Sequence, residues 1–400
     1  MKNLYINDEC VVVNNSQENK CFIFNRKTKT TYNINQEMFD LLKDIKENTN
    51  SQSFYSKKYS TDIIANLILL NVVNYDVSKV VNNIHSIENF NCSRLFFELT
   101  SKCNLKCAHC YGSFSAEAQK ELNYVDIVSM LEKIKEYGTY QIDFTGGEPL
   151  MYKDLDKILE YCYNNGFLVR IFTNLTLFND KFLSLFINYG VREIVTSVDS
   201  CHAECHNQFR GVPKSFERTI DSIKILKESN IPITINSMVG QHNKEHIEEM
   251  IDFIESLNVK SVLDVIIPEG RASILDNSIQ ESAKIIKDIY ENHYKIIDKN
   301  AISVSCGIGD RFVYIKSNGN IYPCPSMTQE CNIIGDIKSF NVVDVWGKLK
   351  NKYCFHCDKK TDKCKNCSGG CRVRANILHN NLNAEDDVYC IVNGVIDGKN

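Results

Sequence analysis

The middle of the chain alternates short apolar runs with longer segments of helical period. The apolar runs predict strands at Leu95–Leu99, Gln141–Phe144, Leu168–Phe172, Glu193–Val198, Ile233–Val239 and Val262–Ile267. The helical periods predict helices at Val125–Tyr137, Leu155–Asn165, Asp180–Tyr189, Ser215–Glu228 and Lys244–Ser256. Six strands that alternate with helices indicate an α/β fold with a parallel sheet. Because parallel crossovers are right-handed, we expect a partial (β/α)6 TIM-like barrel, open on one side, with functional loops at the carboxyl ends of the strands.

Residues 1–88 have a different pattern. Short strands separated by polar turns are predicted at Cys10–Val13, Lys20–Phe24 and Thr30–Asn33. Helices are expected at Gln36–Glu47, at Ser53–Tyr59 and from Thr61 onward, before a closing strand within Asn71–Tyr75. This order predicts a small winged-helix-like α+β domain in front of the barrel.

Composition and charge narrow the class of protein. The hydrophobic fraction of 43% and the charged fraction of 24% are typical of a globular protein. A net charge of −4 argues against bulk binding to nucleic acid or to anionic lipid. The amino terminus lacks the apolar core of a signal peptide, and the longest apolar runs are too short to span a bilayer. We therefore expect a cytoplasmic protein with neither a membrane nor a nucleic acid as partner.

The distribution of the eighteen cysteines indicates that the protein binds metal. A reducing compartment disfavours structural disulfides. Three cysteines lie within residues 103–110, and nine crowd the last hundred residues: Cys306, Cys324, Cys331, Cys354, Cys357, Cys364, Cys367, Cys371 and Cys390. Clusters with gaps of two or three residues have the spacing of metal ligands.

The first cluster is Cys103, Cys107 and Cys110, in C-x3-C-x2-C spacing just after a predicted strand. Thiolate is the ligand that holds iron–sulfur clusters, and a four-iron cluster has four irons to hold. Three thiolates therefore leave one iron open to another ligand. The alternative is zinc, which needs a fourth ligand nearby, and His109 inside the motif cannot easily turn onto the same metal.

This spacing in this context resembles the radical S-adenosylmethionine (SAM) superfamily, whose fourth iron binds the methionine end of SAM. The resemblance implies a [4Fe-4S] cluster on the three cysteines and places His109 near the adenine, where the family has an aromatic residue. It also matches Gly146, Gly147, Glu148 and Pro149, after the second strand, to the GGEP motif that binds the SAM amino group. An ordinary βα turn is the alternative.

Polar residues after the next two strands extend the resemblance. Asn174 would reach the ribose or the amino-acid end of SAM, and Ser197 and Asp199 would lie near the ribose and methionine moieties. Arg210 resembles the arginine that pairs with the SAM carboxylate, which suits a planar guanidinium. A role in a turn or cap is the alternative for each side chain. No catalytic acid or base is predicted.

The segment from Cys201 to His206 has cysteine and histidine pairs four residues apart. Such pairs look like metal ligands. We interpret them as coincidence, because they fall where the family has a variable loop, and ligands there would need a helix of their own.

The carboxyl-terminal cysteines follow a predicted hairpin, Val313–Lys316 and Asn320–Tyr322, with its turn at residues 317–319. The hairpin, the Tyr-Pro-Cys ending at Cys324 and the later Gly-Gly-Cys-Arg element resemble the SPASM domain, which usually carries two auxiliary [4Fe-4S] clusters. The resemblance gives Cys306, Cys324 and Cys371 to the inner cluster. It gives the outer cluster Cys367, Cys390 and two of Cys354, Cys357 and Cys364.

Two features of this array depart from the family. The spacing around Cys354 and Cys364 is stretched, so that five cysteines compete for four places. A further family cysteine is missing, so either Cys331 completes the inner cluster or that cluster has an open iron that binds a substrate thiolate. Zinc knuckles are the alternative, because zinc accepts the same pairs.

Together the resemblances imply a radical SAM/SPASM peptide maturase. Residues 1–88 would be a PqqD-like domain that binds the leader of a ribosomal precursor peptide at a sheet edge, or else a generic cap on the barrel. Residues 89–285 would form the radical SAM barrel, and residues 286–400 the SPASM domain. A 5′-deoxyadenosyl radical would abstract hydrogen from the substrate, with flavodoxin or ferredoxin as electron donor and the auxiliary clusters removing the second electron.

The expected product is a thioether between a peptide cysteine and a carbon of another residue. Other chemistry of the same group is the alternative: carbon–carbon or carbon–oxygen cyclisation, epimerisation, or formylglycine formation in sulfatases. A zinc-stabilised peptide-binding protein without activity is the non-catalytic alternative.

Overall fold

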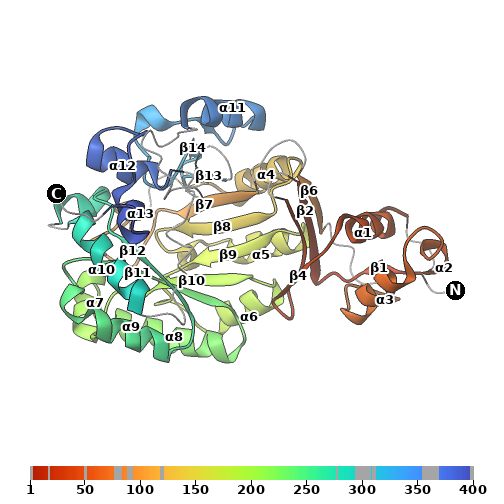
Figure 1. Cartoon of the computed structure of the whole chain (residues 1–400), viewed down its shortest axis with the longest axis horizontal. Helices are drawn as coiled ribbons and strands as arrows, with labels where there is room; N and C mark the ends of the chain where they lie inside the picture. Colours follow the sequence, from red (N-terminus) through yellow and green to blue (C-terminus); the bar gives the residue numbers. More distant parts are fainter. Residues whose placement is uncertain are drawn as a thin grey trace.

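The computed structural model describes residues 3–16, 19–48, 52–75, 83–87, 93–117, 121–275, 278–292, 308, 312–353 and 369–396. Its centre is a curved sheet flanked by helices (Figure 1). No helix of these described segments is long and apolar enough to cross a membrane.

The six predicted barrel strands are confirmed. They are β7 (Arg94–Thr100), β8 (Gln141–Gly146), β9 (Leu168–Phe172), β10 (Glu193–Ser197), β11 (Ile233–Val239) and β12 (Lys260–Val265), and they pair in parallel in chain order. Leu95, Phe97, Ile142 and Phe144 are among their fully buried side chains. Strands in a sheet that is covered on both faces have near-continuous apolar runs, and the sequence shows such runs here.

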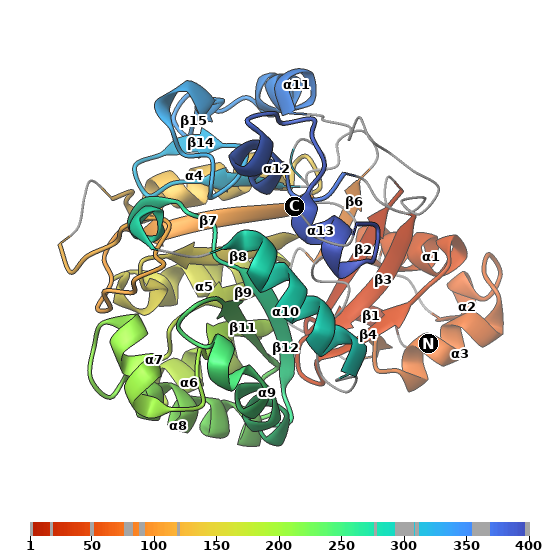
Figure 2. The same ribbon diagram turned by 60° about the vertical axis from the view of Figure 1, so that its left-hand side comes forward.

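The predicted helices also form, with ends that differ by up to three residues. They are α4 (Tyr124–Lys135), α5 (Leu155–Asn164), α6 (Asp180–Asn188), α8 (Ser215–Glu228) and α9 (Ile247–Ser256). Asn123 begins α4 as its cap, because its side chain accepts a hydrogen bond from the backbone of Asp126 at 3.0 Å. Two further helices lie in this region, α7 (Ala203–Arg210) and α10 (Ile279–Asn292). Figure 2 shows α8, α9 and α10 outside the sheet.

The predicted hairpin is confirmed as β13 (Phe312–Ile315) and β14 (Asn320–Tyr322), and β15 (Gly335–Asp336) pairs with β14. β13 also pairs in parallel with β7, so the hairpin extends the barrel sheet beyond its first strand. The carboxyl-terminal helices are α11 (Val342–Tyr353), α12 (Arg372–His379) and α13 (Asp387–Val392), and α13 packs against α10.

The amino-terminal segment forms a second sheet in the order β4 (Thr30–Asn33), β3 (Lys20–Asn25), β2 (Cys10–Asn15) and β6 (Ile84–Ile87). A short pair, β1 (Tyr5–Ile6) and β5 (Val73–Asn74), lies beside the helices α1 (Gln36–Asn48), α2 (Gln52–Tyr55) and α3 (Thr61–Leu69). The predicted strands and helices are therefore confirmed, whereas β1 and β6 were not expected.

This amino-terminal sheet packs on the end of the barrel where the strands begin. Phe22 of β3 contacts Tyr140, which directly precedes β8, with ring centroids 5.8 Å apart. Arg26 is buried, and its guanidinium donates to the carbonyl oxygens of Tyr163 at 3.0 Å and Phe167 at 3.2 Å. His85 contacts the carbonyl oxygen of Gly166 at 3.0 Å. The two sheets are thus joined by buried contacts at the barrel's amino end.

Candidate cluster and cosubstrate site

The three cysteines of the C-x3-C-x2-C motif lie in the loop that follows β7, at the carboxyl end of the barrel. Cys103 and Cys107 are buried, Cys110 is partly buried, and all three line one cavity. The loop is held against α7, because the backbone N–H groups of Lys106 and Ala108 donate to the carbonyl oxygens of Arg210 and Phe209. Burial raises the pKa of Cys103 to about 12, so this thiol keeps its proton until a metal replaces it.

The spacing of these thiols fits a cluster better than a single ion. Tetrahedral zinc, with Zn–S bonds of about 2.3 Å, brings its thiolates to within about 4 Å of one another. Two groups of metal-binding side chains in the described part of the chain bring three donor atoms within 4.8 Å of one another, and the cysteine triplet is not one of them. Three thiols spread around one cavity suit the larger [4Fe-4S] cluster with one iron left open.

The glycines of the GGEP motif allow this loop and the cysteine loop to touch. A Cβ atom added at Gly147 would lie 2.1 Å from the carbonyl oxygen of Lys102, and one at Gly146 would lie 2.3 Å from that of Thr100. The backbone N–H of Gly147 donates to the carbonyl oxygen of Thr100 at 2.8 Å, and that of Glu148 donates to the carbonyl oxygen of Lys102 at 2.7 Å. We expected the glycines to admit a ligand, and the structure shows that they also admit the backbone of the cysteine loop.

Glu148 lies behind the cavity and ties two loops together. Its carboxylate accepts hydrogen bonds from the backbone of Leu150 at 3.0 Å, from the hydroxyl of Thr173 at 2.6 Å and from the backbone of Asn174 at 2.8 Å. Burial raises the pKa of Glu148 to about 7. Pro149 follows it as the first residue of a 3₁₀ turn, Pro149–Met151. Contact of Glu148 with the SAM amino group stays a prediction.

Arg210 and Asp199 form a buried ion pair beside the cysteines. Arg210 Nε donates to Asp199 Oδ2 at 2.7 Å, and Arg210 Nη1 lies 3.7 Å from the sulfur of Cys107. Burial disfavours the charge on Asp199, but Arg210 outweighs it and holds the pKa of this carboxyl well below its usual range. The ion pair with Asp199 thus fixes the guanidinium next to the sulfur of Cys107.

Some of the residues predicted to contact SAM line the cavity, and others pack behind its wall. Gly146, Gly147, Asn174, Ser197 and Arg210 line the cavity with the cysteines. His109 stacks on Phe209 with centroids 4.6 Å apart, and Phe209 stacks in turn on His242 at 3.6 Å. Burial lowers the pKa of His109 to about 3, so its ring is neutral. The predicted contacts of these residues with SAM remain predictions.

Sequence reasoning missed two residues that fix this site. Arg271, in the turn Gly270–Ile274 after β12, lines the cavity and binds the cysteine loop. Glu98 of β7 is fully buried and accepts hydrogen bonds from Tyr314 of β13 and, at 2.6 Å, from the hydroxyl of Ser317. A glycine-arginine pair after the last strand was a usable signal for Arg271, whereas Glu98 sits in an apolar run and depends on a partner more than two hundred residues away.

The auxiliary cysteines are only partly described. Cys306, Cys354, Cys357, Cys364 and Cys367 lie outside the described residues. Cys324 and Cys390 are buried, Cys371 is partly buried, and Cys331 is exposed. Cys371 directly precedes α12 as its N-cap residue. Its backbone N–H donates to the Asp386 carboxylate at 2.7 Å. The assignment of these cysteines to two clusters, with Cys331 or an open iron on the inner one, stays a prediction.

Comparison with known proteins places these features in a family. A model of the radical SAM superfamily matches residues 97–254. The antilisterial bacteriocin subtilosin biosynthesis protein AlbA of Bacillus subtilis is 30% identical over 302 residues, which are 70% of this chain and 66% of that protein. The AdoMet-dependent heme synthase of Methanosarcina barkeri is 28% identical over 348 residues, which are 75% of this chain and 97% of that protein.

Among solved structures, the crystal structure of Streptococcus suis SuiB bound to precursor peptide SuiA has a TM-score of 0.65 at 18% identity, and the match covers 97% of this chain and 99% of that one. The likeness extends over the amino-terminal sheet as well as the barrel. The chain therefore belongs to the radical SAM superfamily, as an enzyme with the fold of its SPASM-type members that uses a [4Fe-4S] cluster and SAM as cofactors.

Proposed function

We propose that this enzyme installs a thioether between a cysteine and a carbon of another residue in a ribosomally made precursor peptide. The observation that carries the proposal is the amino-terminal unit, which accompanies the barrel here as it does in the fold of SuiB. The similarity to the subtilosin biosynthesis protein supports a peptide substrate. When bound, the cluster and SAM supply a 5′-deoxyadenosyl radical that removes hydrogen from a substrate carbon.

The residues of the chain hold and shield that chemistry. The three thiolates leave the fourth iron for SAM, Asn174 and Ser197 face the cavity, and the guanidinium of Arg210 meets the SAM carboxylate. The cysteines of residues 286–400 would hold auxiliary clusters, which would supply an acceptor for the second electron. A low-potential donor such as flavodoxin or ferredoxin reduces the enzyme.

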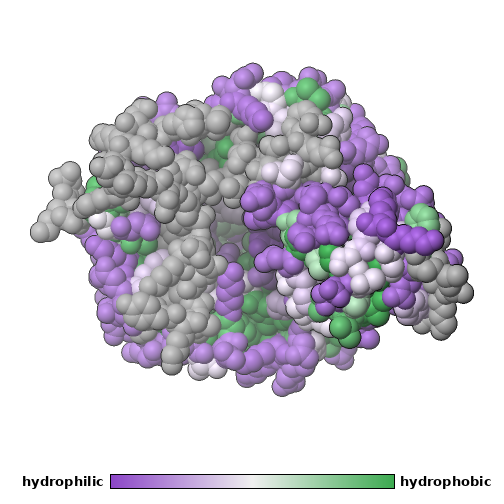
Figure 3. Space-filling model, turned by 45° about the vertical axis from the view of Figure 1, so that its right-hand side comes forward, coloured by the Kyte–Doolittle hydropathy of each residue, from purple (hydrophilic) through white to green (hydrophobic). Residues whose placement is uncertain are grey.

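Residues 1–88 bind the leader of the precursor by adding it as a strand to the sheet. Within the described residues β4 pairs with β3 alone, so its other edge offers backbone groups to a peptide. Thr30, Thr31 and Asn33 of this strand are exposed. Lys29, just before β4, donates to the carbonyl oxygen of Val191 at 2.8 Å, so this edge begins beside the barrel. Figure 3, which turns the right-hand side of Figure 1 forward, shows hydrophilic residues interspersed with hydrophobic patches on the described part of that surface.

A second candidate is modification of a tetrapyrrole, which the similarity to the heme synthase favours. That similarity covers 75% of this chain, whereas the fold of SuiB covers 97% of it. A porphyrin substrate would leave the exposed strand edge of the amino-terminal sheet without a role. We therefore favour a peptide over a porphyrin as the substrate.

The test is incubation of the reduced enzyme with SAM and a short cysteine-bearing peptide encoded beside it. The proposal predicts a product lighter by two hydrogens per crosslink, with cysteine alkylation blocked at the crosslinked residue. An unchanged peptide mass alongside 5′-deoxyadenosine indicates epimerisation instead. Turnover of a porphyrin carboxylate, with the peptide untouched, supports the second candidate.

A further inference from the structure

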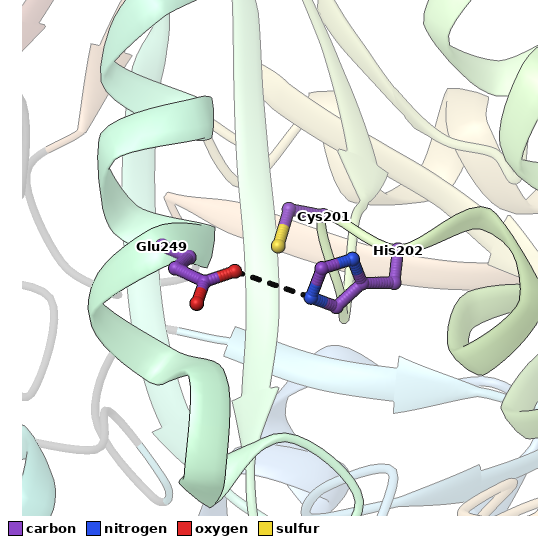
Figure 4. A group of neighbouring side chains, drawn as sticks. All are labelled: Cys201, His202 and Glu249. Carbon is purple, nitrogen blue, oxygen red and sulfur yellow. Dashed lines mark ion pairs between the residues drawn. The ribbon is translucent and has the colours of Figure 1, made fainter.

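A group of metal-binding side chains lies outside the cluster site. Cys201 and His202 follow β10, and Glu249 lies on α9 (Figure 4). One ligand atom from each residue lies within 4.8 Å of the other two, and His202 Nε2 is 3.2 Å from Glu249 Oε2. A thiol, an imidazole and a carboxylate thus meet where two separate elements of the barrel come together.

The surrounding residues fix the orientation of this group. The hydroxyl of Ser200 accepts a hydrogen bond from the backbone of His202 at 3.0 Å and contacts His246 Nε2 at 3.3 Å. The rings of His202 and His246 lie edge to face, with centroids 4.9 Å apart. His246 and Glu249 are three residues apart at the start of α9, so both side chains project toward the turn that carries Cys201.

This arrangement differs from the pairs that the sequence suggested. The expected variable loop contains a helix, α7, but the two histidines of the sequence pair separate. His206 is buried, and its Nδ1 accepts a hydrogen bond from the backbone of Asp199 at 3.3 Å. His202 instead has a side chain that is 52% exposed and turns to Glu249, which is 68% exposed. The group is therefore open to an ion from solution.

We propose that Cys201 Sγ, His202 Nε2 and a carboxylate oxygen of Glu249 bind one divalent zinc ion, with water in the fourth position. Sulfur, nitrogen and oxygen donors in one group suit zinc, which accepts all three. On binding, the Cys201 thiol releases its proton to solvent, the other two ligands donate lone pairs, and nothing is oxidised or reduced.

Occupation of the site would join two elements next to the cosubstrate cavity. Asp199, two residues before Cys201, forms the ion pair with Arg210 and accepts a hydrogen bond from the backbone of Met238 at 3.1 Å. A zinc ion that bridges residues 201–202 and α9 would restrain the strand end that carries Asp199. The zinc would hold these two elements together, and its ligands are not among the three cysteines assigned to the cluster.

The test measures zinc bound by the intact, fully reconstituted enzyme after equilibration with Zn²⁺ and removal of loosely held metal. We expect the wild type to retain one zinc per chain more than either Cys201→Ser or Glu249→Gln, with the same iron content in all three. Cys21→Ser, which changes a partly buried cysteine of β3, is the matched control and should bind zinc as the wild type does.

Co²⁺ provides a second readout, because it reports a bound thiolate. In difference spectra against the cobalt-free enzyme, the wild type and Cys21→Ser should show a thiolate-to-cobalt charge-transfer band that Cys201→Ser lacks. Equal zinc in the wild type and Cys201→Ser, or zinc uptake matched by loss of iron, would overturn the proposal. Neither readout depends on the peptide substrate or on SAM cleavage.

Discussion

Arg271 donates a hydrogen bond from Nε to the carbonyl oxygen of Cys107 at 2.8 Å. The same guanidinium donates from Nη1 to the carbonyl oxygen of Phe114 at 2.8 Å, and the backbone N–H of Arg271 donates to that of Cys110 at 3.0 Å. Arg271, in the turn that follows the last barrel strand, therefore fixes the loop that follows the first strand. Arg271 thus joins the segment after the last barrel strand to the loop that carries the three cysteines.

Replacement of Arg271 by alanine should loosen the cysteine loop. Hydrogen bonds from a charged donor contribute about 1.5–3 kcal/mol each, and two of the three would be lost. We expect iron at the SAM-binding cluster to fall and 5′-deoxyadenosine formation to drop roughly 10–100-fold, as for other residues that orient metal ligands. The exposed Arg218→Ala is the control and should behave as the wild type. Normal iron and SAM cleavage in Arg271→Ala would contradict this role.

The contact between the GGEP loop and the cysteine loop predicts that Gly147→Ala is damaging. Its methyl group would lie 2.1 Å from a backbone oxygen, which cannot move without displacing Cys103. We expect a loss of about 1–3 kcal/mol in the free energy of unfolding and reduced iron content. Gly347→Ala is the control, because its added methyl group would meet no atom within 4 Å beyond its chain neighbours and its own helix. Gly347 lies in helix α11, where alanine should raise the free energy of unfolding by about 0.5–1 kcal/mol. Thermal unfolding and iron analysis of both variants test the comparison.

The junction between the amino-terminal sheet and the barrel should weaken in acid. Burial lowers the pKa of His85 from 6.5 to about 3, so the folded protein favours the neutral ring. This contribution to stability is complete above pH 6.5 and is lost as the pH falls from there toward 3. Between pH 7.5 and 5.5 the loss should be about 1.4 kcal/mol. In His85→Gln the fall in unfolding free energy over this range should be smaller by that amount, and an identical fall would show that another group is responsible.

The proposed leader site and the three cysteines lie at opposite ends of the barrel strands. β7 has seven residues, and at about 3.3 Å per residue the barrel wall is about 23 Å high. An extended peptide that spans this wall needs at least about seven residues. Precursor variants with a shorter spacer should still bind to the enzyme but should not be crosslinked, as binding assays and mass spectrometry would show. Efficient crosslinking with a spacer of two or three residues would refute this path.

Much of the fold could be predicted from the sequence because its signals are local. Strands such as Leu168–Phe172 and helices such as Ser215–Glu228 carry their period within a few residues, and these bounds agree with the structure. The short polar helix α7 has no such period and was missed. The pairing of β13 with β7 joins segments far apart in the chain, so no local pattern reports it.

In the candidate site too, residues of one local motif could be predicted from the sequence, whereas residues that meet only in the fold could not. Cys103, Cys107 and Cys110 form one local motif, and the structure places them around one cavity with Gly146 and Arg210. Arg271 and Glu98 act through backbone and side-chain partners that only the fold brings near. The same holds for Glu249, which completes the group at Cys201 from a different helix. Spacing along the chain reveals ligands that share a loop, but not those that meet across the barrel.

The most direct test of the account is SAM cleavage by the anaerobically reconstituted, chemically reduced enzyme, compared with Cys107→Ala. We predict that the wild type forms 5′-deoxyadenosine and methionine, and that the variant forms neither while retaining the iron of its auxiliary clusters. A wild type that contains no iron, or a variant that cleaves SAM at the same rate, would contradict the assignment of the open-iron cluster to these three cysteines.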